Sequence, residues 1–330
     1  MTEPRAILLV QCPDRPGLVA AISSFLFRHG ANILDFDQHT SEAGGPMKPA
    51  PPVPPLAPGQ VHPPAPPLAN EAGGPMRRAP AGPPLVNGDA GVYFTRLEFQ
   101  TDKIDLPLQD LEKAFEFDVA RPCQMRWRLT LSDRRKRVAI LVSKHDHALL
   151  ELLWAWRRGE LRAEVTAVIS THPDLGQAVA NLGVPFRHIP NTAATRTEAE
   201  ARMAEAIGNA DLVVLARYMQ IISPEFVARW PERIINIHHS FLPAFVGADP
   251  YRQAYDRGVK VVGATAHYVT AELDAGPIIE QDVARVSHRD SVDALKQLGR
   301  DLERRVLARA VRWHCEDRVI VHGNKTVVFS

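Results

Sequence analysis

Apolar positions in the first 131 residues either alternate with polar ones or recur at helical spacing. Alternating and continuous apolar runs predict four strands, at residues 5–12, 33–40, 92–100 and 125–131. Helical spacing predicts one helix after the first strand, at residues 18–30, and another after the third, at residues 106–120. The order βαββαβ is that of a ferredoxin-like α+β unit, in which helices cover one face of an antiparallel sheet.

A different pattern follows residue 137, where fully apolar strands alternate with helical segments. Strands are expected at residues 138–142, 165–169, 212–216, 234–237, 260–268 and 278–285. Helices are expected at residues 147–157, 174–182, 196–208, 224–228, 250–257 and 291–313. Apolar strands separated by helices predict a mainly parallel sheet that is covered on both faces. The predicted fold class is therefore α/β, with a smaller N-terminal α+β domain, and ligands are expected at the carboxyl ends of the parallel strands.

A proline-rich segment interrupts the first domain between its second and third strands. Residues 41–91 hold 15 of the 28 prolines, and the hexapeptide EAGGPM occurs there twice, at Glu42–Met47 and Glu71–Met76. Proline removes backbone donors, and the segment has few large apolar side chains to offset the entropy of ordering. We predict a disordered, partly polyproline-II loop. A PxxP-type site for a partner protein is the alternative interpretation.

The domain boundary is predicted at a short basic segment. Residues 132–137 are interpreted as a linker between a domain at 1–131 and a larger one at 138–330. The charged run Asp133–Arg137 is typical of a solvated linker, and a nuclear or nucleic-acid signal is the alternative.

Composition narrows the classes of function. The chain has 330 residues, of which 45% are apolar, and a formal net charge of +1, so no general attraction to nucleic acid or to an anionic membrane is expected. Cys12, Cys123 and Cys315 are far apart and lack metal-type spacing, which favours a reduced cytosolic compartment. No apolar run approaches the roughly 18 residues of a membrane span. We expect a cytoplasmic protein without a signal peptide.

Candidate chemistry lies in residues 234–276, where apolar runs end in polar side chains. Asn236 and His238 are two positions apart on a predicted strand, so both point to the same side. An amide donor and an imidazole that face one cavity can bind a carbonyl oxygen and exchange a proton beside it. His267 lies on the next strand, and Asp274 could orient His238. The alternatives are a structural histidine pair, and a turn carboxylate at Asp274 with Gly276 at positive φ.

Other chemistries find weaker support. Ser240 follows His238 by two residues, but there is no G-x-S-x-G motif. His145 with His147, or His238 with His239, could suggest a metal site, yet no H-E-x-x-H or C-x-x-C accompanies them, and no metal is expected. The segment after the strand at 138–142 has neither G-x-G-x-x-G nor a P-loop, so dinucleotide and nucleoside triphosphate binding are not predicted.

Several strings resemble known site segments. ARYMQIIS (Ala216–Ser223), NIHHSFLPAF (Asn236–Phe245), GATAHYV (Gly263–Val269) and ELDAGPIIEQ (Glu272–Gln281) resemble those of folate-dependent formyltransferase domains. The first domain resembles an ACT domain, whose ligand loop would be DRPGL (Asp14–Leu18). The combination resembles the formyltetrahydrofolate deformylase family over nearly the whole chain apart from the proline-rich segment.

This resemblance implies hydrolysis of 10-formyltetrahydrofolate to formate and tetrahydrofolate, with the folate as substrate and no other cofactor. Asn236 would stabilise the oxyanion, His238 would act as acid and base, and Asp274 would orient His238. The residues implied to bind the folate are Met219, Gln220, Ile221, Ile222, His267 and Gly276. Where related transferases carry a glycine-rich phosphate turn, this chain has Ser143–His147, which favours water as the formyl acceptor.

The ACT resemblance implies regulation and assembly. Its ligand-loop residues would be Asp14, Arg15, Pro16, Gly17 and Leu18, with glycine and methionine as effectors and a homo-oligomer as the assembly. Two departures from the deformylase pattern follow the catalytic strand, where Val246 replaces a lysine and Asp249 an asparagine. A formyltransferase that uses an amine acceptor and a non-catalytic one-carbon sensor are the alternative functions.

Overall fold

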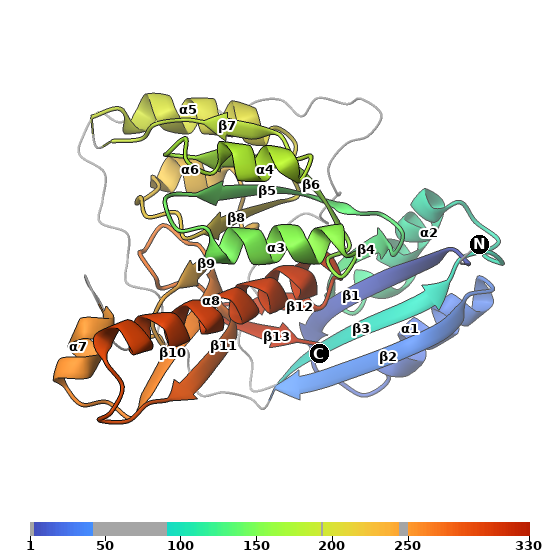
Figure 1. Cartoon of the computed structure of the whole chain (residues 1–330). Coiled ribbons are helices and arrows are strands. Elements are labelled where there is room, and N and C mark those ends of the chain that lie inside the picture. Colours follow the sequence, from blue (N-terminus) through green and yellow to red (C-terminus); the bar gives the residue numbers. More distant parts are fainter. Residues whose placement is uncertain (1–2, 42–90, 193, 244–249) are drawn as a thin grey trace, which may run out of the picture. The chain divides into compact units, whose positions relative to one another are not determined.

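A computed structural model gives the fold and describes residues 3–41, 91–192, 194–243 and 250–330 (Figure 1). The chain divides into two compact units, residues 1–131 and 132–330. The predicted disordered insertion therefore lies outside the described residues, apart from its end residues Ser41 and Gly91. Val246 and Asp249 also lie outside the described residues.

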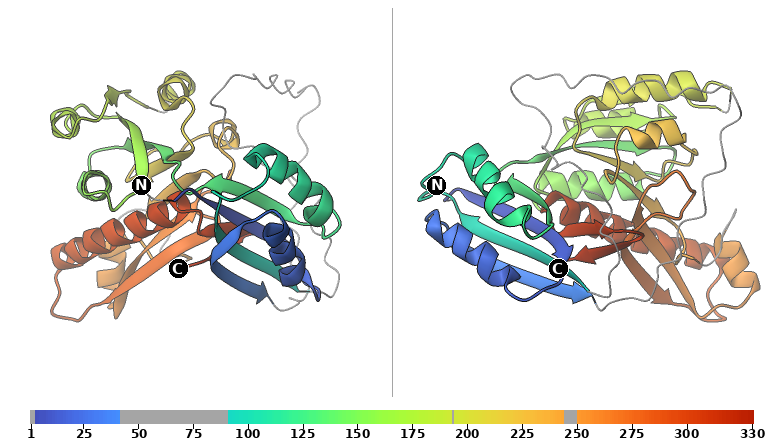
Figure 2. Two further views of the ribbon diagram at one scale, coloured as in Figure 1. Left: turned by 90° about the vertical axis from the view of Figure 1, so that its right-hand side faces the viewer. Right: turned by 180° about the vertical axis from the view of Figure 1, so that it is seen from behind.

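Alternating apolar residues build the antiparallel sheet of the first unit. Its elements are β1 (Arg5–Pro13), α1 (Leu18–Arg28), β2 (Asn32–Ser41), β3 (Val92–Gln100), α2 (Leu108–Phe115), the π-helical turn η1 (Glu116–Ala120) and β4 (Arg126–Leu131). The strand order is β2-β3-β1-β4, and both helices cover one face (Figure 2). Phe25, Leu97, Phe99 and Phe115 are buried between the helices and the sheet. The predicted ferredoxin-like α+β unit is confirmed, except that its second helix ends in a wider π turn.

The second unit is a seven-stranded sheet in the order β11-β10-β9-β8-β5-β6-β7, with a separate hairpin of β12 and β13. Its strands are β5 (Lys136–Val142), β6 (Ala163–Ser170), β7 (Phe186–His188), β8 (Leu212–Ala216), β9 (Ile234–His238), β10 (Val261–Tyr268), β11 (Ile278–Arg285), β12 (Val319–His322) and β13 (Lys325–Val328). Its helices are α3 (His147–Arg157), α4 (Gly176–Asn181), α5 (Arg196–Ile207), α6 (Pro224–Ala228), α7 (Pro250–Asp256) and α8 (Val292–Cys315). Strands β7, β6, β5, β8 and β9 are parallel, while β10 and β11 continue the sheet antiparallel. The prediction of a mainly parallel sheet is confirmed.

Central strand β5 shows why its sequence is continuously apolar. Val138, Ile140 and Val142 belong to the core on the side of α3 and α8. Ala139 and Leu141 belong to the opposite core, which α5 and α6 cover. Because helices cover both faces, successive side chains of β5 are buried on alternate sides, as in other buried parallel strands. Among the helices that the structure describes, none is long and apolar enough to cross a membrane.

The basic segment before β5 is more ordered than the sequence suggested. Strand β5 begins at Lys136 rather than Val138, and Lys136 is buried. The Lys136 Nζ atom donates to Oδ1 of Asp317 and to the carbonyl oxygen of His314, each at 2.6 Å. Arg134 pairs with buried Asp211 at 3.0 Å. The interpretation of this run as a solvated linker is therefore wrong for Lys136, whose charge fixes the end of α8 against β5.

Replacing Lys136 with methionine is expected to destabilise the protein by about 3–5 kcal/mol, because Asp317 would remain as a buried charge that has lost its ammonium partner. Chemical denaturation followed by circular dichroism measures the change. Lys325→Met is the matched control, because Lys325 is exposed on β13. An equal, small effect of both substitutions would contradict the importance of the buried pair.

Candidate active site

Strands β9 and β10 place the predicted polar residues at one edge of the sheet. Ile235 and Ile237 of β9 are buried in the core on the side of α8. Because side chains alternate along a strand, Asn236 and His238 point to the opposite face. The antiparallel register pairs Asn236 with His267 of β10. Asn236 and His267, 31 positions apart in the chain, therefore meet at the middle of β9, and His238 lies at its carboxyl end.

Asp274 reaches both histidines from the turn between β10 and β11. Its Oδ2 atom lies 3.2 Å from Nδ1 of His238, and its Oδ1 atom lies 3.5 Å from Nε2 of His267. The hydrogen bond from His238, and after it the contact with the ring of His267, holds the pKa of Asp274 well below its usual range against the opposing effect of burial. Asp274 is consequently a carboxylate throughout the physiological pH range.

The buried side chain of His267 orients the amide of Asn236. Its Nδ1 atom lies 3.0 Å from the carbonyl oxygen of Tyr268, which can only accept, so Nδ1 carries the proton. In the neutral ring, Nε2 then accepts a hydrogen bond from Nδ2 of Asn236 at 3.2 Å. This contact directs the amide nitrogen of Asn236 and leaves its second N–H for a ligand.

One ring nitrogen of His238, Nε2, is available to accept a proton. Asp274 faces its Nδ1 atom, so the neutral ring carries its proton there and Nε2 has a free lone pair. This Nε2 atom is buried and has no hydrogen-bond partner among the described residues. A fixed amide donor, an imidazole with a free nitrogen and an ionised carboxylate can together polarise a carbonyl group and move a proton beside it.

The turn that presents Asp274 depends on backbone geometry. Asp274 itself has φ +53°, a conformation that L residues seldom adopt. Gly276 does not have positive φ, so that part of the turn interpretation is wrong. It is required for another reason, since a Cβ atom at Gly276 would lie 1.8 Å from the carbonyl oxygen of Tyr268. The close approach of Gly276 to the end of β10 fixes the path of the turn.

The segment predicted to bind folate lies just after β8. The amide of Met219 donates to Oγ of Ser143 at 3.1 Å, and Thr171 donates to the same oxygen at 3.1 Å. Met219 and Ile221 are 53% and 58% exposed, while Ile222 packs partly against the apolar core beside α5 and α6. Gln220 is also exposed. The hydroxyl of Ser143 therefore anchors the start of Met219–Ile222, an accessible and partly apolar strip. This role of Ser143 was not predicted from the sequence.

A second polar cluster also escaped the sequence reasoning. Arg217 follows β8, and its Nε atom lies 3.3 Å from Oε2 of Glu303 on α8. His147 and Tyr251 contact the same carboxylate, at 2.8 Å and 3.0 Å. The one feature of the sequence that indicates this cluster is Glu303, a charged residue on the apolar face of the amphipathic helix α8. Its partners come from distant segments, so their contacts could not be foreseen.

The competing chemistries find no support among the described residues. No group of three or more His, Cys, Asp or Glu side chains in the described ranges is arranged to hold a metal ion. Of the histidines considered for a metal site, His147 is bonded to Glu303 and His238 to Asp274. Ser240 is buried, and its carbonyl oxygen accepts a hydrogen bond from Thr265.

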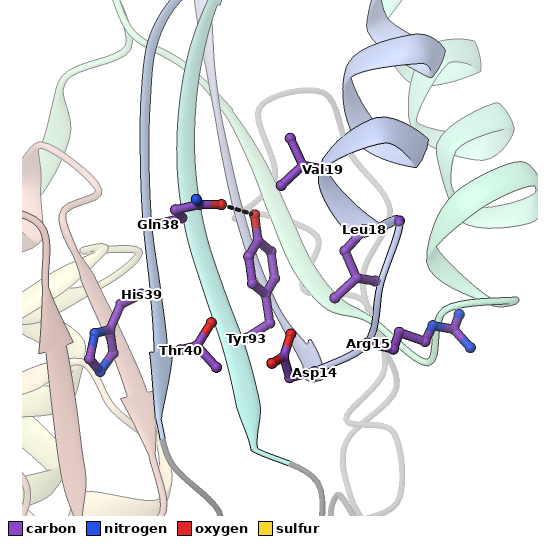
Figure 3. A pocket seen from close by; sticks show the side chains of 9 residues that line it. Asp14, Arg15, Leu18, Val19, Gln38, His39, Thr40 and Tyr93 are labelled. Carbon is purple, nitrogen blue, oxygen red and sulfur yellow. Dashed lines mark hydrogen bonds between the residues drawn. The ribbon is translucent and has the colours of Figure 1, made fainter.

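A pocket of about 360 Å³ opens beside the predicted ligand loop of the first unit (Figure 3). It is lined by Asp14, Arg15, Gly17, Leu18, Val19, Gln38, His39, Thr40 and Tyr93. Four of the five predicted loop residues are in this set, and Pro16 is not. The hydroxyl of Tyr93 donates to Oε1 of Gln38 at 3.1 Å, and Arg15 holds the loop by donating to the carbonyl oxygen of Pro122 at 2.8 Å. Gly17 starts α1 with φ +91°.

Comparison with known proteins agrees with this two-unit arrangement. Residues 136–311 match the family model described as formyl transferase, and residues 6–48 match the ACT domain model. A protein of Bacillus subtilis named formyltetrahydrofolate deformylase is 46% identical, and the match covers 99% of this chain and 95% of that protein. A protein of the same name from Mycobacterium tuberculosis strain H37Rv is 48% identical, with 98% and 90% covered.

A solved structure extends the agreement to the fold. The crystal structure of a formyltetrahydrofolate deformylase from Pseudomonas syringae superposes with a TM-score of 0.83 at 40% sequence identity. The match covers 100% of this chain and 96% of that one. Because identity is well above 30% over almost the full length, the chain belongs to the formyltetrahydrofolate deformylase family.

Proposed function

We propose that Asn236, His238 and Asp274 catalyse the hydrolysis of 10-formyltetrahydrofolate to formate and tetrahydrofolate. The observation that carries the proposal is the 3.2 Å pair between Nδ1 of His238 and Oδ2 of Asp274, which leaves Nε2 of His238 as a base beside the amide of Asn236. The substrate comes from the relatives, which are named for this reaction. Their likeness to this chain covers both units.

In the first step a water oxygen attacks the formyl carbon while His238 Nε2 removes one of its protons. The formyl oxygen takes up the negative charge, and the free N–H of Asn236 stabilises it. A single donor of this kind typically contributes on the order of a hundredfold or more to the rate. His267 accepts a hydrogen bond from one N–H of the Asn236 amide, so the second N–H does not need to reorient during the reaction.

In the second step the bond between the carbon and N10 breaks. The imidazolium of His238 returns its proton to N10, so tetrahydrofolate leaves as a neutral amine. The carbon keeps the oxygen of water and leaves as formic acid, which loses its proton to solvent. Asp274 stabilises the transient imidazolium through the contact to Nδ1, and its ionised state follows from its lowered pKa.

The folate is proposed to lie along Met219–Ile222, with Gly276 shaping the turn on the other side. Exposed Met219 and Ile221, together with half-buried Ile222 and Val269 at the edge of a core, offer apolar surface to a flat pterin ring. Backbone groups of the same strip can bond the polar edge of the ring. His267 supports Asn236 and Asp274, and its direct contact with the folate stays a prediction.

Water is proposed as the formyl acceptor because the segment after β5 is built differently from a phosphate-binding turn. Residues 143–147 contain no glycine, and the Oγ atom of Ser143 already accepts two hydrogen bonds. This segment therefore favours hydrolysis over transfer to an amine. We also propose that the enzyme acts in the cytoplasm as a homo-oligomer and uses no cofactor besides its folate substrate.

The pocket of the first unit is proposed to bind an amino-acid effector, with glycine and methionine as the candidates. The carboxylate of Asp14 would bind the ammonium group of the amino acid. The backbone amides at the start of α1 would bind its carboxylate group, because a helix N-terminus favours negative charge. The hydroxyl of Tyr93 and the amide of Gln38 close the pocket from the sheet.

Replacing His238 with alanine or Asp274 with asparagine is expected to lower kcat on the order of a hundredfold or more, with little change in folate affinity, because the first change removes the acid and base and the second removes the carboxylate that stabilises the imidazolium. Steady-state kinetics and equilibrium binding of a non-hydrolysable folate measure the two effects. His188→Ala is the control, since His188 is exposed on β7. Full activity of either variant would disprove the role assigned to that residue.

Replacing Asp14 with asparagine is expected to weaken binding of the amino-acid effector about tenfold, because a charged partner of its ammonium group is lost. The basal rate without effector should not change. Calorimetric titration and the effector dependence of the rate measure this. Asp102→Asn, at an exposed position of the same unit, is the control. If neither glycine nor methionine binds the native protein or changes its rate, this regulatory proposal fails.

A further inference from the structure

The strip Met219–Ile222 is held at its first end by two polar contacts. The amide of Met219 donates to Oγ of Ser143, which follows β5, at 3.1 Å. The hydroxyl of the preceding residue, Tyr218, donates to Sδ of Met203 on α5 at 3.2 Å. Ser143, Tyr218 and Met203 are all buried. The start of the strip is therefore tied both to the sheet and to α5.

At the other end of the strip, Glu200 of α5 binds Ser223, the residue that follows Ile222. Its Oε1 atom accepts a hydrogen bond from the amide of Ser223 at 2.8 Å, and its Oε2 atom accepts one from the hydroxyl of Ser223. The same hydroxyl oxygen accepts from the amide of Phe226 at 3.1 Å and so caps α6. Glu200 lies three positions before Met203, so one face of α5 contacts both ends of the strip.

The carboxyl group of Glu200 is costly to bury. The residue is only 7% exposed, and within the described ranges no basic side chain pairs with it. A polar group that leaves water costs free energy unless new hydrogen bonds replace those of the solvent, and here Ser223 supplies them. The two oxygens of a carboxyl group match the two donors of Ser223, the amide and the hydroxyl. The position of Glu200 is thus specific for holding this residue.

The backbone between the two ends has few contacts of its own. The amide and carbonyl groups of Gln220, Ile221 and Ile222 have no hydrogen-bond partner in the part of the chain that the structure describes. Backbone groups of this kind bond to water or to a ligand. Ile222 packs only partly against the core, and Met219 and Ile221 are more than half exposed. The course of the strip therefore depends on what holds its two ends.

We propose that Glu200 is a positioning residue for the folate, because it holds Ser223 and thereby keeps Met219–Ile222 in the conformation that binds the substrate. This inference rests on the proposed function for the place of the folate, but the hold on the strip can be measured without substrate. A strip that leaves its binding conformation lowers the apparent affinity in proportion to the time spent away. Glu200 acts through Ser223, so binding should depend on it and the chemical step should not.

The binding test replaces Glu200 with alanine, which removes both acceptor oxygens. We expect KM for 10-formyltetrahydrofolate and Kd for tetrahydrofolate to rise about tenfold, with kcat changed less than about twofold. Steady-state kinetics and calorimetric titration with tetrahydrofolate measure these effects. Glu200→Gln keeps one acceptor oxygen for the amide of Ser223, so its affinity should fall no more than about threefold. Glu205→Ala, at an exposed position of α5, is the control and should match the native protein.

Hydrogen exchange in the full-length protein without folate tests the hold on the strip itself. The amide of Ser223 should exchange on the order of tenfold faster in Glu200→Ala than in the native protein, and at the native rate in Glu205→Ala. If Glu200→Ala does not fold, Ser223→Ala takes its place, since it removes the hydroxyl and leaves α5 intact. Ser223→Ala should weaken tetrahydrofolate binding about threefold. Combining it with Glu200→Gln should weaken binding no more than the stronger single change, because both act on one contact.

Three results would overturn the proposal. One is unchanged exchange of the Ser223 amide in Glu200→Ala. Another is faster exchange with unchanged affinity for tetrahydrofolate, which would leave Glu200 a purely structural residue. The third is a fall in kcat with unchanged affinity, which would assign Glu200 to the chemical step. If exchange and tetrahydrofolate affinity change as expected but the native protein does not hydrolyse 10-formyltetrahydrofolate, then the proposed function fails and the positioning inference stands.

Discussion

The carboxylate of Asp274 is the interaction on which the site depends, because it contacts the imidazoles of two neighbouring antiparallel strands. Its two oxygens face His238 on β9 and His267 on β10. The first contact fixes the tautomer of His238, and the second lies beside the hydrogen bond that orients Asn236. The turn reaches this position only with Asp274 at positive φ and without a side chain at Gly276. Local backbone geometry therefore determines the chemistry of three side chains at once.

The rest of the second unit keeps that edge of the sheet rigid. Ile235 and Ile237 anchor β9 in the core, so the register that opposes Asn236 to His267 is coupled to the packing of α8. The buried contacts of Lys136 fix the far end of α8, and Glu303 in its middle pairs with Arg217 at the end of β8, the neighbour of β9. Buried charges are thus used here to position elements of the second unit.

Much of this arrangement could be predicted from the sequence, because the spacing of apolar residues indicates strands and helices and the face that each side chain occupies. Strand β9 was recognisable as an apolar run, and a period of two placed Asn236 and His238 on one face. Strand β7 and the β12–β13 hairpin were missed because three or four residues carry too little periodicity. The start of β5 was placed too late, since Lys136 reads as a solvent-exposed charge unless Asp317 is known to face it.

The contacts of the site required the third dimension. Sequence spacing could not pair Asp274 with His238, and only the resemblance to a family supplied that role. The support of Asn236 by His267 follows from strand register, and the Arg217–Glu303 pair joins segments that no local pattern relates. In the first unit, the DRPGL loop contributes four of the nine residues that line the pocket.

The fate of the oxygen atom of water tests whether water attacks the formyl carbon at this site. Purified protein is incubated with 10-formyltetrahydrofolate in H₂¹⁸O without any amine acceptor, and the formate is analysed by mass spectrometry. Hydrolysis at this site should place one ¹⁸O atom in each formate and release an equal amount of tetrahydrofolate, and both signals should be lost in His238→Ala. Failure to release formate, or formate that carries no ¹⁸O, would contradict the attack of water at this site.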